Sequence, residues 1–162
     1  MKNIDNPSEK IIIALDGMDK DDVAKLLEKI PELVWVKVGL ELFVSEGPDV
    51  LSMLREKGKK IFLDLKFHDI PTTVARACFV ASQNGAEFIS LHTCSGVKAL
   101  KMANEAAQEG AAKVNLMPPK LLGITILTSW TRESFASDLL INQSIDQRVT
   151  HLAELSLIHI SE

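Results

Sequence analysis

Five apolar segments of strand length, the first four each followed by a segment with helical periodicity, limit what this chain can fold into. Branched and aromatic residues run together in these segments, which is typical of strands buried in a parallel sheet. Strands that alternate with helices predict an α/β fold in which the helices cover a parallel sheet. The predicted strands are residues 11–15, 33–38, 61–65, 87–91 and 121–127.

Residues that start or stop helices stand between these strands. The acidic run 19–22 opens one predicted helix, and Pro48 and Pro71 open the next two, with Gly58 and Gly85 as their stops. A fourth helix is predicted to end near Gly110. Residues 129–144 are predicted to form a loop, and a last amphipathic helix carries Val149, Leu152, Ala153 and Leu155.

Two architectures fit this order of elements, an open doubly wound sheet and a (β/α)8 TIM barrel. No glycine-rich phosphate loop follows the first strand, where a dinucleotide-binding sheet usually carries it. Polar residues recur instead at the carboxyl ends of the strands, and in a barrel these ends meet at one mouth. The sequence therefore predicts a TIM barrel with the following residues at its mouth: Asp16, Lys37, Asp64, Lys66, His92, Thr128 and Ser129.

The chain has 162 residues, whereas a barrel of eight units typically needs about 250. We therefore expect the first five or so βα units, with 1–10 as an N-terminal extension, 11–155 as a partial barrel domain and 156–162 as a tail. An open partial barrel exposes strand edges and apolar surface. We expect the chain as written to be inactive, and a non-catalytic barrel fragment is one alternative function class.

Composition excludes several other classes. Net charge is −4 and no long basic run occurs, which argues against a nucleic-acid surface. Cys78 and Cys94 lack the spacing of a metal site or disulfide framework. No signal peptide and no membrane-spanning run is recognisable, so we expect a protein of the reducing cytoplasm with no membrane partner.

The segment 62–74, FLDLKFHDIPTTV, brings acidic, basic and histidine side chains together within a few residues. Side chains alternate along a strand, so Asp64 and Lys66 are predicted to point to the same side. An acid and an amine side by side at a buried strand end form either a structural ion pair or part of an active site. The segment alone leaves both possibilities open.

Taken together, the strand ends resemble the orotidine 5′-monophosphate decarboxylase family, in its bacterial type. The matching motifs follow the family's order, and the extended motif DLKFHDIP is highly specific. They are IIIALD at 11–16, VKVGLELF at 36–43, FLDLKFHDIPTTV at 62–74, LHT at 91–93 and ITILTS at 124–129.

This resemblance implies decarboxylation of orotidine 5′-phosphate to UMP in pyrimidine biosynthesis, with neither metal nor organic cofactor. Catalysis then depends on preorganised charge and on binding of the remote phosphate. Lys66 is expected to protonate C6, with Asp64 and Lys37 completing an alternating array of charges. Asp69 is expected to reach into the partner subunit's site, which implies a homodimer.

The resemblance also implies a set of substrate contacts, and it places the phosphate-binding Arg and Gln of the family beyond residue 162. Simpler interpretations stay open: Asp16 as a helix cap, Lys37 as a surface lysine, and Thr128 and Ser129 as strand-end hydrogen-bonding groups. His92 and His68 are interpreted as lining or supporting residues. The expected substrate-binding residues are Asp16, Lys37, Asp64, Ile70, Thr73, Thr128 and Ser129.

Sister enzymes on the same barrel are the main alternative. Keto-gulonate-phosphate decarboxylase and hexulose-phosphate synthase share the D-x-K-x-x-D motif but use magnesium, held partly by an acidic residue at the end of the second strand. This chain has Lys37 there, and a cation at that place would repel magnesium. The resemblance therefore favours the metal-free decarboxylase.

Overall fold

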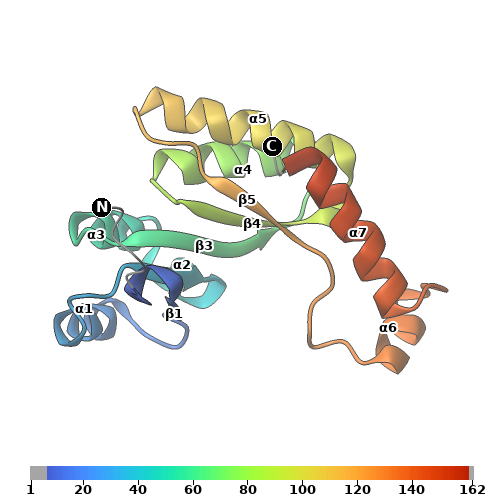
Figure 1. Ribbon diagram of the computed structural model, residues 1–162, viewed down its shortest axis with the longest axis horizontal. Coiled ribbons are helices and arrows are strands. Elements are labelled where there is room, and N and C mark those ends of the chain that lie inside the picture. Colours follow the sequence, from blue (N-terminus) through green and yellow to red (C-terminus); the bar gives the residue numbers. More distant parts are fainter. Residues whose placement is uncertain (1–6, 161–162) are drawn as a thin grey trace.

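A single parallel sheet organises the computed structural model, which describes residues 7–160. Its five strands lie in chain order, so each strand pairs with the next one in the sequence (Figure 1). Their bounds are β1 (Ile12–Ala14), β2 (Trp35–Gly39), β3 (Lys60–Phe67), β4 (Phe88–His92) and β5 (Lys120–Ile124).

Helices connect consecutive strands on the outside of the sheet. The long helices α4 and α5 pack along each other over β3 and β4, whereas α6 lies beside the start of α7 (Figure 1). The bounds are η1 (Pro7–Lys10), α1 (Lys20–Lys29), α2 (Leu40–Glu46), α3 (Asp49–Glu56), α4 (Pro71–Gln83), η2 (Thr93–Ser95), α5 (Val97–Lys113), α6 (Arg132–Leu139) and α7 (Ile145–Ile160).

Sequential parallel strands with a helix after each of them are successive units of a βα barrel. A doubly wound sheet reverses its strand order at a switch point, and no reversal occurs among the described strands. The strand residues that pack between sheet and helices in β2, β3 and β4 are almost fully buried, which fixes the register of these three strands. They include Val36, Val38, Ile61, Leu63, Ile89 and Leu91.

Local signals explain where most helices begin. The Asp19 carboxylate accepts a 2.8 Å hydrogen bond from the Asp22 N–H at the start of α1. Pro71 occupies the first turn of α4, where a missing N–H costs nothing. Both predicted starts are confirmed, as is the start of the second predicted helix beside Pro48.

The predicted strands are confirmed in position, but the fifth is shorter than expected. The ladder between β4 and β5 ends at the pair His92–Ile124. Beyond it, the Thr93 hydroxyl donates a 3.0 Å hydrogen bond to the Ile124 carbonyl. Residues 125–127 therefore lack a strand partner and leave the sheet.

The helices differ from the sequence-based prediction in three places. α5 continues past Gly110 to Lys113, because Gly110 serves as a close-packing position: a Cβ there would collide with the Phe79 backbone of α4. α2 follows β2 directly and was not predicted. The expected loop 129–144 contains α6, which begins with a Thr131–Ser134 capping box and anchors itself through buried Phe135.

Within residues 7–160, no helix combines the length and apolar character needed to cross a bilayer. The N-terminal boundary at residue 10 and the tail 156–162 stay predictions. Residues 1–6 and 161–162 lie outside the described residues, and α7 extends to Ile160.

Candidate active site

Four charged side chains form a continuous chain of alternating sign at the carboxyl ends of β1, β2 and β3. Lys37 Nζ lies 2.8 Å from Asp16 Oδ2 and 3.5 Å from Asp64 Oδ2. Lys66 Nζ lies 2.8 Å from the same Asp64 oxygen. The order along the cluster is therefore Asp16, Lys37, Asp64, Lys66, and we call these four residues the charged array.

Exposure falls from the ends of the charged array toward its middle. The Asp64 side chain is 11% exposed and Lys37 is 21% exposed, whereas Lys66 is 37% and Asp16 is 52% exposed. The array therefore has a desolvated centre and an end open to solvent. Among charges held this way, electrostatic interactions are stronger than between freely hydrated groups.

The sheet register brings these residues together from distant parts of the sequence. Lys37 pairs with Ala14 of β1, so the Asp16 side chain just beyond β1 reaches its ammonium. Asp64 pairs with Gly39 of β2. The absence of a side chain at Gly39 lets the Asp16 carboxylate lie against β2, because an added Cβ would overlap that carboxylate in its present position. The backbone of β2 thus leaves the space that Asp16 fills.

Lys66 occupies an unusual backbone conformation. Its φ of 51° lies in the left-handed region, which a residue with a side chain rarely adopts. The β3–β4 pairing shifts at this point: Leu63 pairs with Ile89, and the next pair is Phe67 with Leu91. Asp64 and Lys66 meet as predicted, but through a bulge and not through regular alternation along a strand.

Several influences act on the Asp64 carboxyl. Burial, the largest, raises its pKa, but hydrogen bonds from Lys66 and Ser90 and the charges of Lys66 and Lys37 together outweigh burial. The pKa of Asp64 is therefore lower than its ordinary value of 3.8. Asp64 is an anion at neutral pH, and the array carries two negative and two positive charges.

A second polar group, around two histidines, flanks the charged array. His68 Nδ1 lies 2.9 Å from Ser95 Oγ and 3.7 Å from Cys94 Sγ, and its ring meets the His92 ring edge-on at 5.4 Å. Burial, and then the positive charges of His68 and Lys66, lower the pKa of His92. His92 is thus kept neutral, which agrees with its interpretation as a lining residue.

The remaining predicted site residues do not join the charged array in this structure. Asp69 is exposed, and its Oδ1 accepts a 2.6 Å hydrogen bond from the Ile70 N–H. Ile70 and Thr73 are exposed at the start of α4. Thr128 and Ser129 lie in an exposed turn beyond β5. Their predicted contacts with a partner subunit or a substrate stay predictions.

One residue that contacts the charged array, Ser90 of β4, was not predicted from the sequence. Its hydroxyl donates a 2.8 Å hydrogen bond to Asp64 Oδ1 and accepts a 2.9 Å hydrogen bond from the Lys66 N–H. The available signal was a hydroxyl between two apolar residues of a predicted buried strand, Ile89 and Leu91. A buried polar group needs a hydrogen-bonding partner. Nothing local in the sequence identified those partners.

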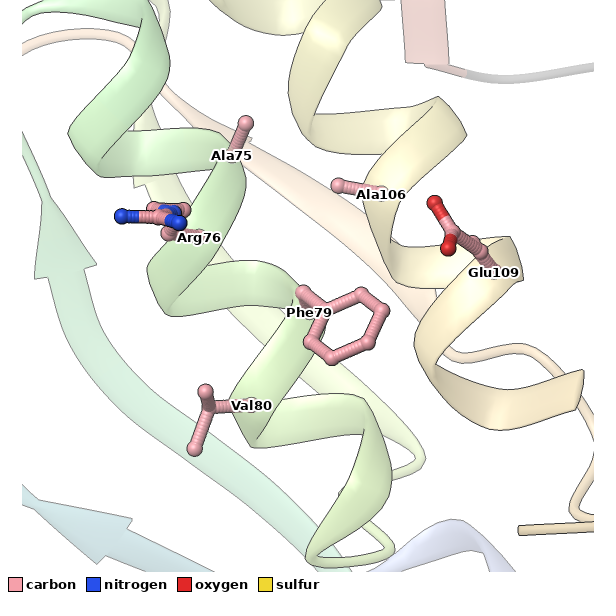
Figure 2. A pocket seen from close by; sticks show the side chains of 6 residues that line it. All are labelled: Ala75, Arg76, Phe79, Val80, Ala106 and Glu109. Carbon is pink, nitrogen blue, oxygen red and sulfur yellow. The ribbon is translucent and has the colours of Figure 1, made fainter. Parts of the chain in front are cut away.

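A separate cavity of about 510 Å³ lies between α4 and α5, on the outer surface (Figure 2). Figure 2 shows the Phe79 ring extending from α4 toward α5, and Lys113 Nζ stands 4.8 Å from the centre of that ring. No residue of the charged array lines this cavity. Among the side chains that the structure describes, those of residues 7–157, no group of three or more acidic, His or Cys side chains is arranged to hold a metal ion.

Parallel strands in chain order, with a polar cluster at their carboxyl ends, define a segment of a (β/α)8 barrel with its active-site mouth. Comparison with known proteins identifies the family. The chain belongs to the orotidine 5′-phosphate decarboxylase / HUMPS family, whose model matches residues 9–158.

The similar proteins carry a consistent name. The chain is 90% identical over 156 residues to orotidine 5′-phosphate decarboxylase of Prochlorococcus marinus (strain NATL1A), covering 96% of this chain and 65% of the relative. The chain is 57% identical over 151 residues to the orotidine 5′-phosphate decarboxylase of Prochlorococcus marinus (strain MIT 9211). This match covers 93% of this chain and 63% of the relative. The chain thus spans a little under two thirds of the length of these curated relatives.

A solved structure supports the fold. The crystal structure of orotidine 5′-phosphate decarboxylase from Lactobacillus acidophilus superposes with a TM-score of 0.85 at 34% identity, covering 92% of this chain and 67% of that chain. The expectation of partial TIM-barrel units is therefore confirmed.

Proposed function

We propose that this chain is the catalytic N-terminal part of an enzyme that decarboxylates orotidine 5′-phosphate to UMP without a metal or organic cofactor. The observation that carries the proposal is the charged array, in which Lys66 stands at one end beside the largely desolvated Asp64. The names of the relatives support the same substrate.

The chemical problem in this reaction is a localised carbanion. When the C6–carboxylate bond breaks, its electron pair stays on C6 of the pyrimidine as CO2 departs. A fixed ammonium beside C6 lowers the energy of that developing charge, because a preorganised charge needs no reorganisation during the reaction. Lys66 then transfers one proton to C6, which completes UMP and leaves a neutral amine for solvent to reprotonate.

Asp64 and Lys37 hold this ammonium in place. Asp64 Oδ2 contacts both amines, at 2.8 Å from Lys66 and 3.5 Å from Lys37, so one carboxylate oxygen links the two lysines. We infer that Asp64 also faces the substrate carboxylate and favours its departure. We infer that Asp16, the most exposed member of the array, accepts hydrogen bonds from ribose hydroxyls.

The magnesium-dependent activity of the sister enzymes is the second candidate. The matching family model covers HUMPS, the hexulose-phosphate synthase group, as well as the decarboxylases. The position of Lys37 argues against a magnesium site. Its ammonium lies between Asp16 and Asp64, the two carboxylates that a divalent cation at the end of β2 would use. A cation bound there would have to displace Lys37.

We further propose a homodimer in which Asp69 enters the partner's site, and a cytoplasmic location. The exposed position of Asp69 beyond β3 supports the first. Both cysteines are unpaired, Cys78 in the core and Cys94 exposed, which suits a reducing compartment.

The experiment uses a hybrid protein, in which residues 9–158 of this chain replace the matching residues of the strain NATL1A relative. The hybrid is incubated with orotidine 5′-phosphate in excess EDTA, and UMP is measured by chromatography. We expect steady formation of UMP at the same rate with and without EDTA. Absence of UMP, or a requirement for added magnesium, would overturn the proposed function.

A further inference from the structure

The bulge in β3 leaves one residue of β4 facing three residues of β3. Between the pairs Leu63–Ile89 and Phe67–Leu91, β3 contains residues 64–66, and β4 contains only Ser90. A bulge of this kind removes regular ladder partners from the backbone groups inside it. At this bulge the Ser90 side chain supplies a partner.

The Ser90 hydroxyl makes its hydrogen bonds in both directions. A hydroxyl has one proton to donate and lone pairs to accept. The proton goes to Asp64 Oδ1 at 2.8 Å, and a lone pair receives the Lys66 N–H at 2.9 Å. Ser90 is 0% exposed, so water is not at hand to replace either bond.

These two bonds act on the two residues at the reacting end of the charged array. The bond from the Lys66 N–H fixes a left-handed backbone, which a residue with a side chain rarely adopts. The bond to Asp64 Oδ1 turns the carboxylate so that Oδ2 faces both lysines. A single buried hydroxyl therefore sets the backbone of Lys66 and the orientation of Asp64.

We propose that Ser90 is a positioning residue for the decarboxylation: it holds the Asp64 carboxylate and the Lys66 ammonium in reactive geometry without contacting substrate. This inference rests on the proposed function for its kinetic consequences. Its structural consequences, which concern the Lys66 amide and the Asp64 carboxyl, can be measured without turnover.

The test compares three variants of the hybrid. Ser90→Ala removes both bonds, Ser90→Thr keeps a hydroxyl, and Ser82→Ala is the matched control. Ser82 is equally buried and its hydroxyl donates a 2.7 Å bond to the Cys78 carbonyl, but it lies in α4 away from the array. Ser82→Ala therefore reports the general effect of losing a buried hydroxyl.

For Ser90→Ala we expect kcat to fall by about 10- to 100-fold with KM changed by less than about 3-fold, because misplacement of a reacting group slows chemistry more than binding. The acid limb of the kcat profile moves to higher pH, since a hydrogen bond that favours ionised Asp64 is lost. Ser90→Thr recovers most of kcat, and Ser82→Ala keeps both kcat and the pH profile.

Two structural measurements separate failure of this inference from failure of the proposed function. Hydrogen exchange of the Lys66 amide becomes faster in Ser90→Ala, and the Asp64 carboxyl, followed by carbon NMR, titrates at higher pH. If both are unchanged, Ser90 positions neither residue, whatever the hybrid catalyses. If both change while an active hybrid keeps its kcat, the positioning has no catalytic role, and the inference is also overturned.

Discussion

Gly39→Ala tests whether the position of Asp16 in the charged array matters, because it changes the space beside Asp16 and leaves all four charged residues in the sequence. Gly39 has a φ of −86°, which alanine adopts without strain. The added Cβ would overlap Asp16 Oδ1 and stand 3.3 Å from Lys37 Nζ. Because the Asp16 carboxylate is at the end of a flexible side chain and is half exposed, it can turn away into solvent. The substitution therefore moves Asp16 while leaving the sheet in place.

The expected magnitudes differ for stability and for catalysis. Loss of an exposed ion pair costs about 0.2–1 kcal/mol, and replacing glycine in an extended conformation returns about 0.4–1 kcal/mol, so the free energy of unfolding changes by less than about 1 kcal/mol. A hydrogen bond from a substrate hydroxyl to a charged group contributes about 1.5–3 kcal/mol. Loss of the Asp16 contact should therefore raise KM by about 10- to 150-fold.

The assay is a double-mutant cycle in the hybrid, with initial rates of UMP formation for wild type, Gly39→Ala, Asp16→Ala and the double variant. We expect each single variant to raise KM and the double variant to match Asp16→Ala within about 2-fold. If Gly39→Ala leaves KM unchanged, or if its effect persists in full without the Asp16 carboxylate, the reasoning about this spacing is wrong.

Three further predictions address other residues. Lys66→Ala should lower kcat by at least about 10⁴-fold in a folded hybrid, since it removes both the proposed proton donor and a positive charge of the array; rates within 10-fold of wild type would contradict its proposed role. Because the pKa of His92 is lowered by folding, the unfolded chain takes up the proton first, and stability is lost as pH falls through about 6.5. The melting temperature of His92→Asn should therefore fall less between pH 7.5 and pH 5.5 than that of wild type or of His151→Asn, a control at an exposed site. Equal decreases in melting temperature for all three proteins would refute this prediction. Mixing Lys66→Ala with Asp69→Ala hybrids under subunit exchange should restore about a quarter of wild-type activity if each site combines both subunits, whereas no recovery would remove Asp69 from the partner's site.

Sequence patterns were sufficient for the parts of the fold that depend on local physics. The apolar runs placed all five strands, because buried parallel strands need continuous apolar residues. Asp19 and Pro71 marked the helix starts. The Asp64–Lys66 contact was also predicted, since both residues belong to one short segment.

The bulge at Lys66 was not predictable from the same patterns. Leu63, Leu65 and Phe67 alternate with Asp64 and Lys66, and this alternation is identical for a regular strand and for the bulged one. Left-handed backbone is usually signalled by glycine or asparagine. At Lys66 it is instead supported by the hydroxyl of a residue 24 positions later in the sequence.

Glycine and short helices caused the remaining differences. Gly110 was interpreted as a helix stop, although its role depends on the Phe79 backbone of a neighbouring helix. α6 has a weak apolar pattern, with Phe135 as its one buried residue, so tertiary packing and the capping box specify it more than periodicity does.

The claim that Lys66 delivers the proton is tested most directly by a crystal structure of the hybrid with UMP bound. We predict that Lys66 Nζ lies within about 3.2 Å of C6, with Asp64 on its other side and the Asp16 carboxylate at the ribose hydroxyls. A structure in which this nitrogen points away from the pyrimidine ring, with another donor closer to C6, would contradict the claim.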